Sequence, residues 1–275
     1  MDGDGDGGQV GGDKLARELR KLRLDKNVKA VVMRVNSPGG SASASDLIQR
    51  EVILTKKEKP VIISMGYLAA SGGYWISTYG DRIFAEPNTI TGSIGVFGLL
   101  PNVKKLANEH GITWDEVTTS KMANPMTLAR PKSEFELARI QGVVDHIYDQ
   151  FLSKVSESRH ITKADVNEIA QGRVWSGQEA LKLKLVDELG GLEDAIRYAA
   201  KKAKIENDYR VDGPGAGKKP LEKLMEALSG EKQRKLTKGP AEQVMAEFQR
   251  QLKVLTSLND PQGVYARMPM EISIR

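Results

Sequence analysis

The sequence predicts an α/β protein in which a parallel sheet is covered by helices on both sides. Two apolar segments, 28–35 and 61–65, have the near-continuous hydrophobic character of strands buried on both faces. Each is followed by a glycine-rich loop and then by a helical pattern, at 42–55 and 74–79. Because repeated strand–loop–helix units wind with one hand, both loops should lie at the carboxyl edge of the sheet, where α/β proteins bind ligands.

The composition is that of a soluble globular protein and excludes several kinds of site. Of the 275 residues, 40% are hydrophobic and 28% are charged, which permits a sizeable core. There is no cysteine, so disulfides, thiolate metal sites and a cysteine nucleophile are excluded. Neither an apolar run of membrane-spanning length nor a leader pattern is present, so no span and no signal peptide are predicted. The net charge is only +5, and the basic stretch 218–238 has no interleaved aromatic residues, which indicates a solvated helix face and no nucleic-acid binding.

Residues 1–12 form a glycine-rich N-terminal segment that partly matches a calcium loop. Asp2, Asp4 and Asp6 have the spacing of calcium ligands, but no helix precedes them and Asp13 stands where a glutamate belongs. A glycine-rich turn is therefore favoured over a calcium site, and no metal is predicted. Asp13 is expected to cap a helix over 14–24, whose leucines form one apolar stripe.

The elements beyond the two strand–loop–helix units are less regular. The expected order is a strand at 83–85, a turn at 86–88, a glycine-rich loop at 91–95, a helix at 99–109 ended by Gly111, an extended piece at 112–118 and an irregular loop at 121–131. The longest helical pattern covers 133–158, where Ser133 and Glu136 form a capping box. Shorter helices are expected at 163–171, 177–184 and 192–203.

A change of composition after residue 205 divides the chain. Residues 13–205 form the main domain, and the glycine- and proline-containing stretch 206–220 is a linker. The remainder, 221–275, is a helical C-terminal extension. Within it we expect amphipathic helices at 221–228 and 241–255 and a short strand at 264–268.

A single hydroxyl, Ser71, stands where the second strand passes into a helix. The glycine-rich pieces around it are either turns between strands or parts of a site, and local pattern alone does not choose between these interpretations. A serine nucleophile needs a base and an oxyanion site. The histidines, at positions 110, 146 and 160, fall on predicted helices or helix ends, and no G-x-S-x-G elbow surrounds Ser71. A desolvated lysine is the remaining base, and Lys121, beside Met122 and Met126, is a candidate.

Four segments give the chain a specific resemblance. They are NSPGGS at 36–41, MGYLAASGGYWIS at 65–77, NTITGSIGVFG at 88–98 and AQGRVWSGQEALKLKLVDELGGLEDA at 170–195. They resemble the signal peptide peptidase A family, also called protease IV, within the wider Clp protease and crotonase superfamily. The resemblance runs in family order over most of residues 9–205 and is strongest to the catalytic, carboxy-terminal half of the long, tandem-domain form.

The resemblance implies a role for individual residues. Ser71 matches the nucleophile, Gly40 and Gly72 match the backbone donors of the oxyanion hole, and Ser93 matches the serine that hydrogen-bonds a lysine base. Lys121 matches the base of the short, single-domain form, whereas in the long form of some bacteria the base comes from the amino-terminal half. Both sources stay open. A substrate strand should add beside the glycine-rich segments, with contacts to Gly39, Ser41 and Gly92.

The implied function is that of a serine endopeptidase with a serine–lysine dyad and no cofactor. Its substrates would be residual signal peptides and other extended apolar peptides. The resemblance further implies a ring-like homo-oligomer associated with the membrane, at the outer face of the bacterial inner membrane. Two other functions remain: an inactive or incomplete half of a tandem peptidase that acts as a scaffold, and a crotonase-like acyl-CoA enzyme, which would use the oxyanion hole without needing Ser71.

Overall fold

A long central strand, β3 (Val61–Ala70), organises the fold in the computed structural model, which describes residues 2–5, 9–213 and 264–267. β1 (Val31–Ser37) pairs with one edge of β3. The other edge is shared by β4 (Arg82–Ala85), along the first half of β3, and β5 (Ile90–Gly92), along its last residues. All three pairings are parallel, as the sequence predicts, so β1, β3 and β5 end at the same edge of the sheet.

Two short outer strands complete this sheet. β8 (Glu188–Leu189) is parallel to β4, and β7 (Val174–Ser176) is antiparallel to β5. A second, three-stranded sheet contains β2 (Gly39–Ser41), β9 (Val264–Arg267) and β6 (Phe97–Gly98), with β9 in the middle and antiparallel to both neighbours. The strand expected at 264–268 is confirmed.

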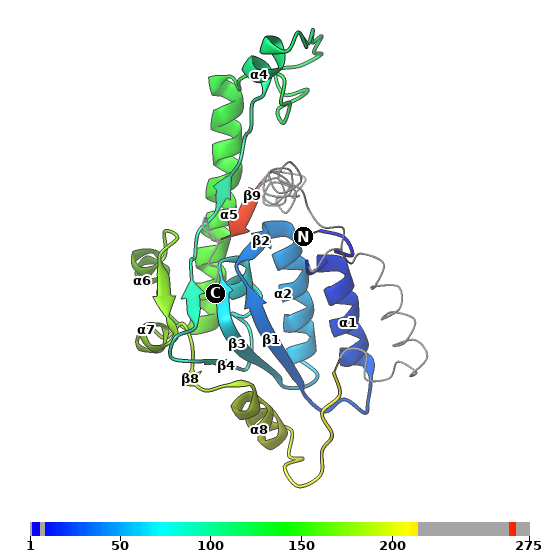
Figure 1. Cartoon of the computed structure of the whole chain (residues 1–275). Coiled ribbons are helices and arrows are strands. Elements are labelled where there is room, and N and C mark those ends of the chain that lie inside the picture. The colour runs from blue at the N-terminus through cyan, green and yellow to red at the C-terminus, as the bar shows by residue number, and fades with distance from the viewer. Residues whose placement is uncertain (1, 6–8, 214–263, 268–275) are drawn as a thin grey trace, which may run out of the picture.

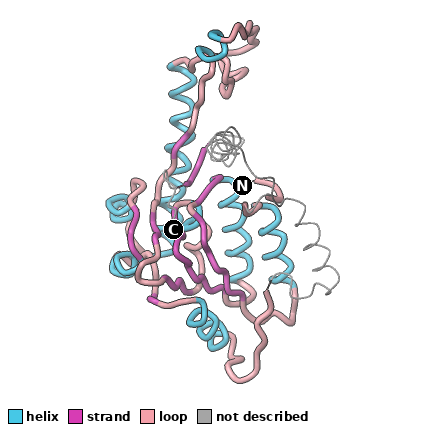
Figure 2. Tube along the Cα trace, in the orientation of Figure 1, coloured by secondary structure: helices cyan, strands magenta, loops and turns pink. Residues whose placement is uncertain are grey.

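Helices cover both faces of the main sheet (Figures 1 and 2). Alternate residues of β3 show the two layers. Val61 and Ile63 belong to the large core cluster, which includes α1 (Gly12–Leu24) and α2 (Ala42–Lys56). Ile62 instead packs with Ala195 and Ala199 of α8 (Leu192–Lys202). The predicted fold class is therefore confirmed.

The two N-terminal helices, α1 and α2, begin at different kinds of N-cap residue. α1 begins at Gly12 with Gly11 as its N-cap, so the expected cap by Asp13 is wrong, and Asp13 lies inside the first turn. α2 is capped by Ser41, whose Oγ accepts a hydrogen bond from the N–H of Ala44 at 3.1 Å. Ser41 thereby fixes the start of α2 at the end of the loop that follows β1.

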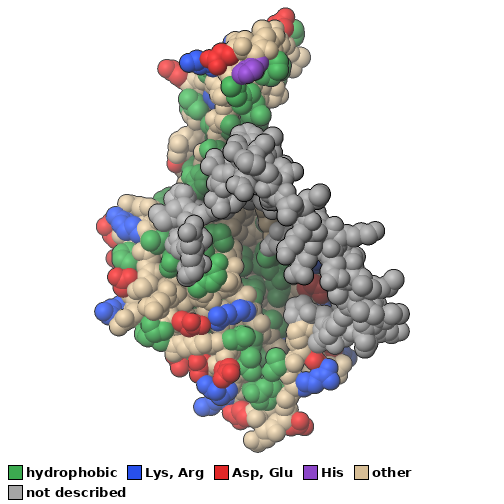
Figure 3. Space-filling model, viewed as in Figure 1, with side chains coloured by type: hydrophobic (Ala, Val, Ile, Leu, Met, Phe, Trp, Pro, Cys, Tyr) green, Lys and Arg blue, Asp and Glu red, His purple; other side chains and the backbone are tan. Residues whose placement is uncertain are grey.

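A long projection extends from the body, and we call residues 99–146 the arm (Figure 1). It contains α4 (Lys104–Glu109), the irregular loop after it and the first half of α5 (Glu134–Arg159). The predicted capping box of Ser133 and Glu136 is confirmed. The apolar stripe of α5 is buried only near its C-terminal end, at Phe151, Leu152 and Val155. Apolar side chains on the arm remain exposed and are visible in Figure 3.

The remaining helices are short. They are α3 (Gly72–Trp75), α6 (Lys163–Ile169) and α7 (Gly177–Lys182). None of the helices in the described ranges combines the length and apolar character that crossing a membrane requires. The linker expected at 206–220 is described only to residue 213, and the helices expected at 221–228 and 241–255 lie outside the described residues.

Candidate active site

Ser71 lies at a sharp turn between β3 and α3, buried from solvent. Its backbone has φ 53° and ψ −115°, a conformation that a residue with a side chain adopts at a cost on the order of 1–3 kcal/mol. Two bonds hold this turn: the N–H of Ser71 donates to the carbonyl of Gly92 at 2.9 Å, and the carbonyl of Ser71 accepts from the N–H of Trp75 at 2.8 Å. A strained serine between a strand and a helix is also the arrangement that presents a hydrolase nucleophile.

Gly72 and Gly40, the two expected oxyanion donors, lie against each other. A β-carbon built on Gly72 would be 3.1 Å from the nitrogen of Gly40 and 2.7 Å from Oγ of Ser45. Since a β-carbon is essentially never found within 3.0 Å of another atom, a side chain at position 72 would force its neighbours to shift. A β-carbon on Gly40 meets no described atom within 4 Å, so the protein itself leaves space on that side. The loop after β1 and the turn after β3 thus bring two backbone N–H groups beside Ser71.

The loop after β5 closes another side of the site. The hydroxyl of Ser71 donates to the carbonyl of Gly95 at 3.4 Å. Ser93 is buried with φ 48°, and its N–H donates to the carbonyl of Arg173 at 2.7 Å. Gly92 has φ 77° and lies so close to Trp175 that a β-carbon there would be 2.7 Å from the indole ring. Pairing of Ala70 with Gly92 places this loop beside Ser71.

The expected substrate contacts Gly39 and Ser41 lie on β2, at the edge of the small sheet. Gly39 has φ 99°, and its N–H donates to Oγ of Ser37 at 3.1 Å. The neighbour of β2 is β9, with Gly40 opposite Ala266. The sequence predicts a strand at 264–268 but not its pairing with β2 and β6, because the partners of this strand are distant in the sequence.

Lys121 is not brought beside Ser71 within this chain. Its amine lies 5.7 Å from the ring of Phe135, at the far end of the arm. Phe135 is separated along α5 from Phe151, which packs on Trp75, by about 24 Å at the helical rise of 1.5 Å per residue. Lys121 and Met122 are exposed, so the expected removal of water from the amine is not provided within this chain. Among the described residues, no hydrogen bond or ion pair joins a lysine to Ser71.

The histidines do not supply a base either. His110 follows α4 and bonds the carbonyl of Leu106, His146 lies within α5 beside Gln150, and His160 follows α5. These positions agree with the sequence analysis. Among the residues that the structure describes, no group of three His, Asp or Glu residues is placed to hold a metal ion. Asp4 pairs with Arg17, and Asp2 accepts from the hydroxyl of Ser43.

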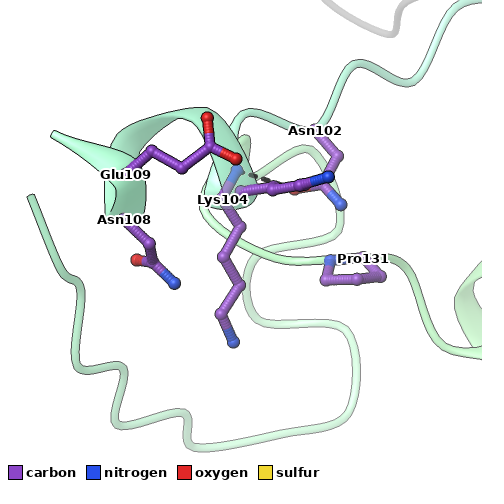
Figure 4. A pocket seen from close by; sticks show the side chains of 6 residues that line it. Asn102, Lys104, Asn108, Glu109 and Pro131 are labelled. Atoms are coloured by element: carbon purple, nitrogen blue, oxygen red, sulfur yellow. Dashed lines mark hydrogen bonds between the residues drawn. The ribbon is translucent and has the colours of Figure 1, made fainter.

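A shallow hollow at the far end of the arm does not compete with this site (Figure 4). It is lined by Asn102, Lys104, Lys105, Asn108, Glu109 and Pro131. The charged ends of Lys104 and Glu109 point in opposite directions and do not converge on one point (Figure 4). The candidate site is therefore the one at Ser71, where the expected nucleophile and oxyanion donors lie together.

The sequence of this chain is similar to those of known peptidases and proteases. The model of Peptidase family S49 matches residues 53–206. The chain is 40% identical to Protease 4 of Haemophilus influenzae, in an alignment that covers 96% of this chain and 44% of that protein. It is 36% identical to the putative signal peptide peptidase SppA of Enterococcus faecium, covering 72% of this chain and 59% of that one. It is 34% identical to a putative protease of Synechocystis, in an alignment that covers 71% of this chain and 70% of that protein. The chain spans less than half the length of the Protease 4 relatives.

Proposed function

The chain belongs to peptidase family S49, and on this premise we propose that it is a serine endopeptidase with Ser71 as its nucleophile. One observation carries the proposal: a buried, strained serine whose turn lies against the backbone N–H groups of Gly40 and Gly72. The resemblance drawn from the sequence motifs is confirmed by the family match.

The chemistry follows from these groups. The Oγ of Ser71 adds to the carbonyl carbon of a peptide bond, while its proton passes to a base. The N–H groups of Gly40 and Gly72 stabilise the oxyanion, and the loss of one such donor costs about 100- to 1,000-fold in turnover. The base returns the proton to the departing amine, and water then hydrolyses the acyl-enzyme.

The base is proposed to be a lysine delivered by another chain. Lys121 lies at the end of an arm that exposes large apolar side chains, including Leu106, Trp114 and Val117. Several large apolar side chains exposed on one projection are typical of a surface that contacts another protein. We propose that a homo-oligomer brings Lys121 of one copy to Ser71 of the next, where Ser93 orients its amine. The alternative source is the part of the Protease 4 relatives that this chain does not span.

The substrates are proposed to be residual signal peptides and other extended apolar peptides, in line with the name of the Enterococcus relative. An extended peptide would pair with the edge formed by Gly39–Ser41. In the full assembly the enzyme would be associated with the membrane, at the outer face of the bacterial inner membrane. We assign the catalytic domain to residues 13–205, a linker to 206–220 and an extension to 221–275.

Labelling with a fluorophosphonate serine probe tests the nucleophile. Wild type and the control Ser153→Ala, an exposed serine of α5, should be labelled and should hydrolyse an extended apolar peptide. Ser71→Ala should lose both properties while keeping its circular dichroism spectrum. Peptide hydrolysis that persists in Ser71→Ala contradicts the assignment. Turnover of an acyl-CoA ester by Ser71→Ala would instead support the crotonase-like alternative.

A further inference from the structure

The four residues of β9 lie in the position where a peptide substrate is expected to bind. β9 is antiparallel to β2, with Gly40 opposite Ala266, and antiparallel to β6, with Phe97 opposite Tyr265. β2 and β6 do not pair with each other in the described sheet, so β9 alone joins them. A peptide that adds to a sheet edge makes this same set of main-chain contacts.

The carbonyl of Ala266 lies beside the two residues that are expected to supply the oxyanion donors. A β-carbon built on Gly72 would be 2.8 Å from the carbonyl oxygen of Ala266 and 3.1 Å from the nitrogen of Gly40. These atoms therefore surround one point, beside the turn that holds Ser71. In a peptidase, the carbonyl in this position belongs to the bound peptide.

Two side chains of β9 are buried in the body of the protein. Tyr265 and Ala266 are almost fully buried, and the rings of Tyr265 and Phe97 lie 5.9 Å apart between centroids. Ala266 belongs to the main core cluster, so a small side chain enters the body at the residue whose carbonyl faces Gly72. The strand is thus held by its backbone on both edges and by two buried side chains.

We propose that β9 is a resident occupant of the peptide-binding position, so that the chain's own C-terminal strand competes with substrate. The inference rests on the proposed function, because it takes Ser71, Gly40 and Gly72 as the reacting centre. A strand on the same chain meets its site at a high effective concentration. The apparent affinity for an external peptide falls by the fraction of time that the site is open. A peptide substrate therefore has to displace Val264–Arg267 before it is cleaved.

Displacing the strand in the full-length chain tests this proposal. Ala266→Trp places a large side chain at a buried position that holds only a methyl group. The control, Ala164→Trp, makes the same change at an exposed position of α6. Binding of a fluorescent acetyl-Val-Tyr-Ala-Arg-amide peptide is measured by anisotropy, together with kcat and KM for an extended apolar peptide. If β9 fills the site for nine-tenths of the time, Ala266→Trp should bind the peptide about tenfold more tightly and lower KM by the same factor. The control should match wild type.

The outcomes separate this proposal from the proposed function. Unchanged or weaker peptide binding in a folded Ala266→Trp protein overturns the proposal. It would show that β9 is a permanent part of the binding site and is not displaced by substrate. Should that variant not fold, Tyr265→Ala removes the contact with Phe97 without adding bulk, and it should strengthen peptide binding to a smaller degree. No change in that folded variant also overturns the proposal. Absence of Ser71-dependent hydrolysis in every variant contradicts the proposed function, whereas the binding measurement still decides the role of β9.

Discussion

Trp75 and Phe151 pack with their ring centroids 4.5 Å apart, and this contact fastens the helix after Ser71 to the buried end of α5. Both side chains are almost completely removed from solvent. The arm and the turn that holds the serine are therefore anchored through the same pair of rings.

Replacement of Phe151 by alanine should destabilise the protein by about 3–5 kcal/mol, because it leaves a cavity against Trp75. Phe135→Ala, at the exposed end of the same helix, is the matched control and should change stability by less than about 0.5 kcal/mol. Urea unfolding followed by circular dichroism measures both. Equal losses in the two variants would show that the rings at 75 and 151 do not form this anchor.

Gly72→Ala should abolish turnover while the chain still folds. The added β-carbon meets the Ser45 hydroxyl, the Ala266 carbonyl and the Gly40 nitrogen, so the oxyanion donors must move apart. Loss of one donor predicts a decrease in kcat of about 100- to 1,000-fold. Gly142→Ala is the control, because its β-carbon meets nothing within 4 Å, and it should leave kcat unchanged and stabilise α5 by roughly 1 kcal/mol. Wild-type turnover in Gly72→Ala contradicts the oxyanion assignment.

Mixing two inactive variants should restore activity if Lys121 acts on the serine of another copy. Ser71→Ala and Lys121→Ala are each expected to be inactive. Random assembly in a ring gives about a quarter of the sites one intact serine and one intact lysine. The measurement is peptide hydrolysis after co-refolding, with Lys105→Ala, another exposed lysine of the arm, as an active control. A mixture that stays inactive places the base outside the residues of this chain.

The end of the arm should loosen in acid. Arg130 donates to both oxygens of Glu136 at 2.8 Å, and the N–H and hydroxyl of Ser133 donate to the same carboxylate. The hydrogen bonds from Arg130, followed by those from Ser133, hold the pKa of Glu136 well below its usual range. Since the pKa is lower in the folded state, the stabilisation is complete above the ordinary carboxyl pKa of about 4.3 and is lost as the pH falls below it.

Hydrogen exchange of the first turn of α5, corrected for intrinsic rates, measures this effect. Protection in the wild type should decrease below about pH 4.3, the range in which an unfolded glutamate becomes protonated. Glu136→Gln should be less protected already at neutral pH and should change little on acidification. A wild type whose protection is constant down to pH 3 would contradict the role of the Arg130–Glu136 pair.

The strands and helices that bury a continuous apolar face could be predicted from the sequence. β1, α2 and α8 appear close to their expected positions because their own residues supply the pattern. β3 begins at Val61 as expected but continues to Ala70, five residues beyond the expected apolar segment. β2, β6, β7 and β8 are two or three residues long, and partners distant in sequence determine them. α4 begins at Lys104 instead of residue 99, since Pro101 disfavours helix in the residue before it.

The candidate site was predictable to the extent that strand ends determine it. Ser71, Gly72 and Gly40 meet because β1 and β3 are parallel and end at one edge. The position of Lys121 was not predictable, because the apolar pattern of α5 is the same whether a residue packs in the core or stands on the arm. Phe135 and Phe151 belong to one periodic stripe, yet only Phe151 is buried.

If Lys121 of one copy serves Ser71 of another, as proposed, the length of α5 makes the activity of the enzyme depend on its own concentration. A single chain carries its serine in the body and Lys121 at the far end of the arm. Under the proposed exchange of Lys121 between copies, such a chain alone would be an inactive precursor. Dilution should switch such a protein off without unfolding it, and gathering of copies should switch it on. Proteolysis would then be confined to places where enough copies accumulate.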